Sequence, residues 1–408
     1  MTTTRSKVTT VKQICDLIPP HLIPKLSREH GVDEMCRTFD ATSHVVSLMF
    51  AQVSHALSLN DVCDTLQNHS GVLTTIRHAV PPRRNTLSHA DRERNPDMAE
   101  ALFWEVLASL KERSPKFGEE RRYVALPHRF KKIINAIDSS TIQLVANCMD
   151  WAKHRRRKAA AKMHVRLNLN TFLPAFVVVD PAKIGDPRKA RELCADLKEG
   201  EIVTFDKAYN EFKHLHDLEQ RGVVWVGRAK DNMAYEVVRE LPASTNPDIL
   251  LDAEIRLTTP TTFADYPTSF RLVRAMVEID EKKVMMEFVT NNFKWAASSV
   301  CDLYKARWGI ETFFKQMKQT LQLADFLGHN ENAVRWQIWT ALLVYILLRY
   351  IAHAGQWMHS FSRLFTMLRG VLWECLDLFP LVRGYGTASK PPKLIARADQ
   401  AYLLGFEL

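Results

Sequence analysis

The sequence is poor in residues that define several classes of protein. Its 408 residues include only 14 glycines, 18 prolines and seven cysteines. So few glycines and prolines exclude a collagen-like or low-complexity chain. The cysteines are scattered and form no Cys-x-x-Cys pair. This pattern argues against a disulfide framework or a structural zinc site and favours a reducing compartment.

Long apolar segments are also scarce. No apolar stretch follows the basic residues near the N-terminus, so we expect no signal peptide. The most apolar window, Ile338–Ala352, has about 15 residues and includes Arg349, whereas a membrane span needs about 20. We therefore expect a buried core helix, no membrane partner and a cytoplasmic protein.

The sequence has an excess of positive charge. Its formal net charge of +9 favours a polyanionic partner. Residues 111–132 hold eight bases and three acids, and residues 153–166 hold seven bases and no acid. Three of these bases, Arg155, Arg156 and Arg157, are consecutive. We expect the two segments to form a track for DNA phosphates on either side of Asp138, although a solvated charge run is the simpler alternative.

The first 115 residues show helical periodicity. Apolar residues recur every three or four positions in Val11–Leu26, Ala41–His55, Ser58–His69 and Pro96–Lys111. Ser58 can cap the third of these helices. A turn at residues 81–88 then leads into a short basic helix that contains Arg84. This order suits a helix-turn-helix DNA reader, but a plain helical bundle gives the same pattern.

After about residue 130 the pattern becomes that of an α/β sheet. Apolar or β-branched runs alternate with helical segments, with strands expected at Lys132–Asp138, Met163–Leu169, Phe172–Val179, Ile202–Phe205 and Val223–Val226. Helices are expected at Pro181–Lys198 and Tyr209–Arg221. Residues 229–292 look like a β-rich insertion, with runs at Glu254–Leu257, Phe270–Ile279 and Val284–Thr290. From Ala297 to about Leu378 the chain is again helical.

Two of these strands end on an acid, namely Asp138 and Asp206. Open α/β sheets bind ligands beyond the carboxyl ends of their strands. One such aspartate is usually a turn residue, but two in one sheet can share hard divalent metal ions.

A third acid, Glu311, lies on a helix expected to start near Ser298. At about 100° per residue, Tyr304, Arg307, Glu311 and Lys318 share an arc of about 60°. The residue types predict metal-assisted phosphoryl transfer, in which Asp138, Asp206 and Glu311 hold two Mg²⁺ ions, for which Mn²⁺ can substitute. Arg307 and Lys318 would grip phosphates, and Tyr304 would donate a hydrogen bond there.

The spacing of these four residues resembles the signature of a known family. Tyr304, Arg307, Glu311 and Lys318 match the pattern Tyr-x2-Arg-x3-Glu-x6-Lys of the DDE transposases of bacterial insertion sequences. Other blocks resemble the same family, namely Ile137–Thr141, Asp206–Tyr209, Phe288–Asn291, Ser58–Val62 and Arg84–Asp91. Two positions depart from it: Asp91 replaces a common Asn, and Ala208 a common Gly.

The resemblance implies an α/β ribonuclease H-like catalytic core at residues 125–228 and 293–350, interrupted by the β-rich insertion at 229–292. An all-helical DNA-binding domain at 1–115 would precede it, and C-terminal helices at 351–408 would follow. The expected activity is that of a transposase, an endonuclease that also transfers strands. It would bind the terminal inverted repeats of double-stranded DNA, cut the ends and join the 3′-hydroxyls to target DNA. A homodimer in the DNA complex and association with the nucleoid are expected.

Two alternatives stay open. The chain could be a hydrolytic nuclease with the same fold, or a non-catalytic DNA-binding repressor derived from a transposase. For His164, Trp225 and Trp295 we favour core packing over a role in the active site.

Overall fold

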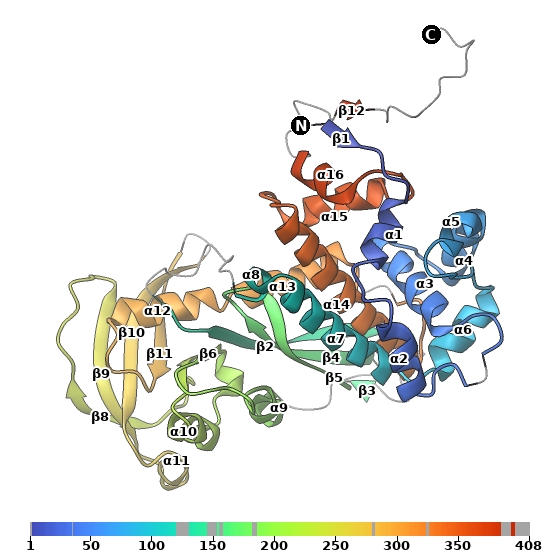
Figure 1. The fold of residues 1–408 in the computed structure, drawn as a ribbon. Coiled ribbons are helices and arrows are strands. Elements are labelled where there is room, and N and C mark those ends of the chain that lie inside the picture. The colour runs from blue at the N-terminus through green and yellow to red at the C-terminus, as the bar shows by residue number, and fades with distance from the viewer. Residues whose placement is uncertain are drawn as a thin grey trace, which may run out of the picture. The chain divides into compact units, whose positions relative to one another are not determined.

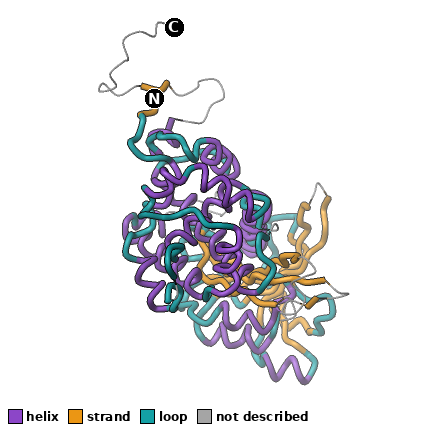
Figure 2. The backbone as a smooth tube through the Cα atoms, turned by 90° about the vertical axis from the view of Figure 1, so that its right-hand side faces the viewer, coloured by secondary structure: helices purple, strands orange, loops and turns teal. Residues whose placement is uncertain are grey.

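The protein divides into two compact units. The computed structural model describes residues 2–34, 36–119, 130–144, 153–154, 158–181, 186–279, 282–323, 326–384 and 393–395. Unit 1 comprises Met1–Phe117 and Lys315–Leu408, and unit 2 comprises Gly118–Phe314. Figure 1 shows the elements of both units, and Figure 2 shows that helices make up most of unit 1.

The N-terminal part of unit 1 is a set of helices. They are α1 (Thr10–Cys15), α2 (Leu22–Glu29), α3 (Ala41–Ser54), α4 (Leu59–Asn68), α5 (Ser70–Thr74), α6 (Arg84–Glu93), α7 (Asp97–Arg113) and α8 (Pro115–Glu119). Ser58 accepts a hydrogen bond from the Asp61 amide, so the predicted cap is confirmed. The single helix expected at Val11–Leu26 is wrong. The chain forms α1 and α2 instead, because Pro19 and Pro20 between them cannot continue a helical ladder.

A long apolar helix forms the core of unit 1. This helix, α14 (Glu331–Ala354), packs against α3, α6 and α7, and against α15 (Phe361–Gly370) and α16 (Leu378–Gly384). It is the one described helix whose length and composition would allow it to cross a membrane, and 72% of its apolar window is buried inside the protein. The predicted buried core helix is thus confirmed. A parallel pair of short strands, β1 (Thr2–Thr4) and β12 (Lys393–Ile395), completes unit 1.

Unit 2 is built on a mixed ten-stranded sheet. Its order is β3-β4-β2-β6-β7-β11-β10-β9-β8, and β5 also pairs with β4. The first strands are β2 (Ile134–Leu144), β3 (Lys153–His154), β4 (Lys158–Asn168), β5 (Leu173–Pro181), β6 (Ile202–Phe205) and β7 (Val224–Arg228). The strands β2, β6 and β7 are parallel, with crossovers through α9 (Asp186–Leu193) and α10 (Phe212–Gln220). The predicted α/β sheet is therefore present.

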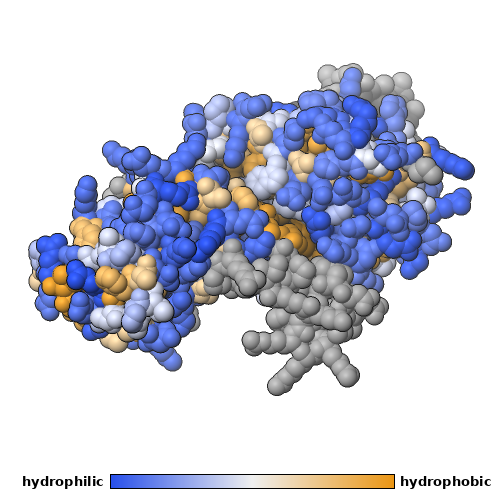
Figure 3. Space-filling model, turned by 90° about the horizontal axis from the view of Figure 1, so that it is seen from below, coloured by the Kyte–Doolittle hydropathy of each residue, from blue (hydrophilic) through white to orange (hydrophobic). Residues whose placement is uncertain are grey.

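The β-rich insertion continues this sheet. It contains β8 (Tyr235–Glu240), β9 (Ile249–Leu257), α11 (Pro260–Asp265), β10 (Phe270–Ile279) and β11 (Lys282–Thr290). Because β11 pairs with β7, the insertion strands extend the central sheet. The core beneath them contains Trp225, Tyr266 and Phe270. Some apolar side chains of this part stay exposed, including Val237, Leu250 and Met285, and hydrophobic patches are visible among hydrophilic residues at this end of unit 2 in Figure 3.

The helix that carries the signature differs from the predicted one. It is broken into α12 (Ala297–Ala306), α13 (Gly309–Lys315) and a π-helical turn at Gln316–Thr320. The single continuous helix predicted to carry all four signature residues is therefore wrong, because the chain breaks at Arg307–Trp308 and widens into a π-turn at Gln316–Thr320. From Lys315 onward the chain clusters with unit 1, and the assignment of residues 293–350 to the catalytic domain stays a prediction.

Candidate active site

The first two acids lie at the same edge of the parallel part of the sheet. Pairing between β2 and β6 runs from Ile134 opposite Ile202 to Ile137 opposite Phe205. Asp138 and Asp206 are the next residues on the two strands. The expectation that the first strand ends at Asp138 is wrong, because β2 continues to Leu144 through its pairing with β4. Asp138 is nevertheless positioned where the parallel pairing stops, so its carboxylate lies at the same edge as that of Asp206.

Arg307 connects two of the three acids. Its Nη1 donates to Asp138 Oδ2 at 3.2 Å, and its Nη2 donates to Glu311 Oε1 at 3.0 Å. The guanidinium carbon also lies 5.4 Å from the centre of the Tyr304 ring. The Arg307 side chain is only 7% exposed, whereas that of Glu311 is 57% exposed. Arg307, which directly follows the last residue of α12, thus places a buried cation between an acid of the sheet and an acid of the next helix.

Tyr304 holds the remaining acid. Its hydroxyl donates to Asp206 Oδ1 at 3.2 Å, and its ring packs 4.9 Å from that of Phe288 on β11. Burial raises the pKa of Tyr304 to about 12. The hydroxyl therefore stays protonated at neutral pH and can act as a donor to Asp206. All three predicted acids of unit 2 are in this way connected to Tyr304 and Arg307.

The charge of the site is unbalanced. Burial raises the pKa of Asp138, and the negative charges of Asp206 and Glu311 raise it further, while the Ser139 amide and Arg307 oppose the shift. The Ser139 amide donates to Asp138 Oδ1 at 2.7 Å. Three carboxylates thus influence one another with one guanidinium among them. Such a site attracts a further cation.

The oxygen donors suit a hard divalent cation such as Mg²⁺, which prefers carboxylate ligands. Within the part of the chain that the structure describes, however, no three acidic, histidine or cysteine side chains are close enough to hold one ion. Arg307 provides the physical reason, since its guanidinium is bonded to both Asp138 and Glu311. The donor set fits the metal in its chemistry, and these contacts would have to rearrange for an ion to bind.

The other predicted binding residues have different surroundings. Lys318 belongs to unit 1, in the π-helical turn, where burial lowers its pKa. Arg84 is exposed on the first turn of α6. Arg155, Arg156 and Arg157 lie outside the described residues. Arg166, which we counted in the basic track, is instead buried and forms a two-pronged ion pair with Asp196, at 2.5 and 2.8 Å.

Sequence reasoning missed a buried ion pair in unit 2 and a buried histidine–aspartate hydrogen bond in unit 1. Arg271 donates to both Asp252 oxygens, at 2.7 and 2.6 Å, and to the carbonyls of Asn292 and Trp295 before α12. The one signal was an arginine inside the otherwise apolar start of β10. In unit 1, His44 is 2.8 Å from Asp91, and both are buried. Asp91 thus lies inside the helical core, where it cannot contact a base.

His164, Trp225 and Trp295, for which we favoured core packing, are buried or partly buried against other residues of unit 2. Trp225 is fully buried and makes edge contacts with Tyr266 and Phe270. His164 is fully buried on β4, in register with Ser139. Trp295 is partly buried against Phe130.

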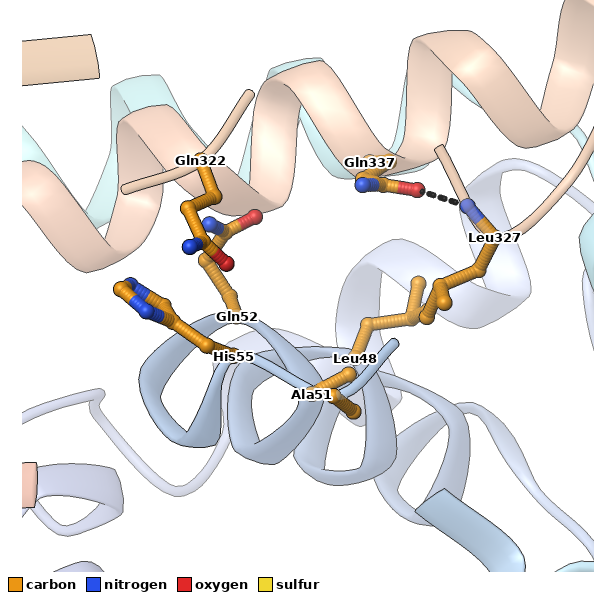
Figure 4. Close-up of a pocket in the computed structure, with 8 residues that line it drawn as sticks. Leu48, Ala51, Gln52, His55, Gln322, Leu327 and Gln337 are labelled. Carbon is orange, nitrogen blue, oxygen red and sulfur yellow. Dashed lines mark hydrogen bonds between the residues drawn. The ribbon is translucent and has the colours of Figure 1, made fainter. Parts of the chain in front are cut away.

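A small cavity lies in unit 1. It has a volume of about 20 Å³, which is room for one water molecule. Gln52, His55, Gln322 and Gln337 line it, and Gln337 accepts a hydrogen bond from the Leu327 amide at 2.9 Å (Figure 4). The three carboxylates belong to unit 2.

The fold and site define an α/β protein whose sheet and signature helices bring together three acids, an arginine and a tyrosine. The chain belongs to the transposase DDE domain family, whose pattern matches residues 129–347, more than half of its length. Residues 6–76 match a domain of unknown function, DUF4372. The resemblance found from the signature is thus confirmed.

Relatives of the chain are named as transposases. A putative transposase, y4zB, of Sinorhizobium fredii is 29% identical over 62% of this chain and 70% of its own length. A probable transposase for insertion sequence element IS5377 of Geobacillus stearothermophilus is 28% identical over 55% of this chain and 58% of its own length. The piggyBac transposase, solved as a synaptic complex with hairpin DNA, has a TM-score of 0.47 at 13% identity and covers 95% of this chain and 85% of its own. That likeness is too weak to support a conclusion.

Proposed function

We propose that the protein is a transposase that binds the terminal inverted repeats of a mobile element, cleaves the DNA ends and joins the freed 3′-hydroxyls to target DNA. The observation that supports this most is the meeting of Asp138, Asp206 and Glu311 around Arg307 and Tyr304. Tyr304, Arg307 and Glu311 are three of the four residues with fixed spacing in the family signature, and Asp138 and Asp206 lie in two other blocks that resemble the family. Their convergence from two strands and a helix is what a shared reaction centre requires.

Asp138, Asp206 and Glu311 are proposed to hold Mg²⁺, or Mn²⁺ in its place. When bound, the metal supplies Lewis-acid stabilisation and an activated hydroxyl or water for phosphoryl transfer. The sheet contributes a fixed pair of carboxylates, and the exposed Glu311 completes the set from the signature helix. Tyr304 holds the Asp206 carboxylate in place through its hydroxyl.

DNA would be held by basic residues of both units. We propose that Arg307 and Lys318 contact phosphates beside the cleaved bond, and that Arg155, Arg156 and Arg157 extend this contact along the backbone. In unit 1 we propose that α6 reads the repeat. Its exposed residues include Arg83, Arg84 and Asn85, all in or before its first turn, and the N-terminal residues of a recognition helix are those that reach base edges.

The remaining features of the proposal follow from this function. The core would be ribonuclease H-like, with the strands β8–β11 as its insertion and C-terminal helices after residue 350. Two DNA ends must be paired, so we propose a homodimer in the DNA complex, acting in the cytoplasm at the nucleoid. A test must distinguish the transposase from the two alternative functions, a hydrolytic nuclease and a DNA-binding repressor.

The test uses purified protein, Mg²⁺ and a labelled duplex that carries the end of the element. We expect a cut that leaves a 3′-hydroxyl at the end, and we expect Asp138→Asn, Asp206→Asn and Glu311→Gln each to abolish it. Asp217→Asn, which removes an exposed carboxylate on α10, should cut like the wild type. Binding of the duplex without any cleavage would support the repressor and overturn the enzyme.

A further inference from the structure

Arg307 contacts two carboxylates that a metal ion would also need as ligands. Its guanidinium bonds to Asp138 at 3.2 Å and to Glu311 at 3.0 Å, and the side chain is 7% exposed. These are two of the three carboxylates proposed above as metal ligands. We infer that Arg307 is an internal counter-ion, which competes with the divalent metal for Asp138 and Glu311 and moves to a DNA phosphate when the metal binds. This inference rests on the proposed function and adds a coupling between metal and DNA.

The first reason is electrostatic. A guanidinium keeps its proton at any physiological pH, so it cannot leave the carboxylates by losing its charge. Removing it alone would leave Asp138 and Glu311 without a counter-charge beside Asp206. Exchange for another cation avoids that cost, and the 57% exposure of the Glu311 side chain gives an incoming ion access.

The second reason is that Arg307 is incompletely satisfied in its present position. Its Nε is buried and finds no hydrogen-bond acceptor among the described residues. A buried donor without a partner costs about 1–3 kcal/mol. A phosphate has several oxygens that can accept hydrogen bonds from a guanidinium. Two of them can bind the guanidinium at once, and Nε can be one of the donors. The phosphate is therefore a better partner for Arg307 once a metal has taken the carboxylates.

The third reason is the local backbone. Arg307 follows the last residue of α12, and α13 begins only at Gly309, so two residues separate the helices. A side chain at such a junction can change direction without unwinding a helix. The Tyr304 ring, 5.4 Å from the guanidinium, offers a surface along which it can move.

A coupling of this kind is reciprocal. If metal binding frees Arg307 for phosphate, then metal tightens the binding of DNA ends, and DNA tightens the binding of metal by the same factor. Neither effect requires cleavage. Both can be measured while the DNA remains intact, with a duplex in which a non-cleavable methylenephosphonate replaces the scissile phosphate.

The first experiment measures Mn²⁺ binding by full-length protein without DNA, by electron paramagnetic resonance. We expect Arg307→Ala to bind Mn²⁺ about fivefold or more tightly than the wild type, which is the lower end of ordinary coupling. Lys305→Ala removes an exposed positive charge two residues away and should stay within about twofold of the wild type, as expected for a screened surface charge. If Arg307→Ala does not fold, Arg307→Gln replaces it.

The second experiment measures the affinity for the non-cleavable end duplex with and without Mn²⁺. We expect Mn²⁺ to tighten binding by the wild type and by Lys305→Ala, and to have little effect in the Arg307 variant. Equal or weaker Mn²⁺ binding by that variant, or an undiminished effect of Mn²⁺ on its DNA affinity, overturns the inference and leaves the proposed function standing. If the wild type binds no Mn²⁺, or if Asp138→Asn binds Mn²⁺ as tightly as the wild type, the proposed metal site itself is overturned.

Discussion

The Tyr304 hydroxyl donates a hydrogen bond of 3.2 Å to Asp206, which lies 98 residues earlier in the chain. This bond connects α12 to the end of β6 and fixes one carboxylate oxygen. Because the other signature contacts run through Arg307, Tyr304 is the sole residue of the described site that holds Asp206 from the signature helix. The bond therefore gives a specific prediction.

Tyr304→Phe should reduce the rate of end cleavage about tenfold to a hundredfold and leave the fold intact, since a hydrogen bond to a charged carboxylate contributes about 1.5–3 kcal/mol. Burial raises the pKa of Tyr304 to about 12, so the hydroxyl is protonated throughout the range from pH 6 to 9. The pH profile of the variant should then have the wild-type shape at a lower rate. A changed profile, or an unchanged rate, would contradict the role of Tyr304 as a donor.

The buried pair of His44 and Asp91 gives a prediction for unit 1. Asp91→Ala leaves the buried His44 ring without this acceptor and should lower the free energy of unfolding by about 1–3 kcal/mol. Asp91→Asn keeps an oxygen acceptor at the same position and should cost less than about 1 kcal/mol. Chemical denaturation of the two variants measures the difference. Equal losses would mean that the charge of Asp91, and not its hydrogen bond, is what matters.

The ion pair of Arg271 and Asp252 gives a prediction for unit 2. Arg271→Met leaves Asp252 buried without its partner and frees two carbonyls before α12, so we expect a loss of about 3–5 kcal/mol. Arg239→Met breaks the neighbouring pair with Glu254. Because the Arg239 side chain is 66% exposed, that change should cost at most about 1 kcal/mol. Denaturant melts that rank the two variants in the opposite order would refute this account.

His214 makes the stability of unit 2 depend on pH. Burial, assisted by the nearby Arg191, lowers the pKa of His214 to about 4. The unfolded chain takes up this proton near pH 6.5 and the folded chain only near pH 4, so the stabilisation is complete above about pH 6.5 and is lost as the pH falls. The full effect is on the order of 3 kcal/mol.

His214→Gln should therefore lose less stability than the wild type between pH 7 and pH 4.5, as followed by denaturant melts. Burial also lowers the pKa of His44, so some acid sensitivity should persist. His359→Gln, at an exposed position, should keep the wild-type dependence. If His214→Gln loses as much stability as the wild type, His214 is not protonated on unfolding in this range.

Local sequence signals predicted those parts of the fold that depend on local interactions. The helix at α3, the Ser58 cap and the strand β10 were expected within a residue or two of where they lie. β8 was missed, because its sequence Tyr-Glu-Val-Val-Arg-Glu is largely polar and it is an edge strand of the sheet. Polar edge strands are common, and their pairing is set by the neighbouring strand.

The residues of the candidate site were singled out from the sequence and their roles stay predictions, whereas their geometry was predicted less well. The signature spacing identified Tyr304, Arg307 and Glu311, since helical neighbours at i and i+4 meet on one face. The contact between Arg307 and Asp138 joins positions 169 residues apart, and the continuation of β2 past Asp138 depends on pairing with β4. The contact and the longer strand both depend on tertiary packing, which cannot be predicted from periodicity in the sequence.

The most direct test of the central claim is to detect joined DNA. Purified protein, Mg²⁺, the end duplex and a supercoiled target plasmid are incubated, and the junctions are sequenced. We predict that the 3′ end of the duplex is joined to plasmid DNA in the wild type and in Asp217→Asn, and that Asp138→Asn gives no junctions. Cut ends without any junction would identify a hydrolytic nuclease and contradict the account.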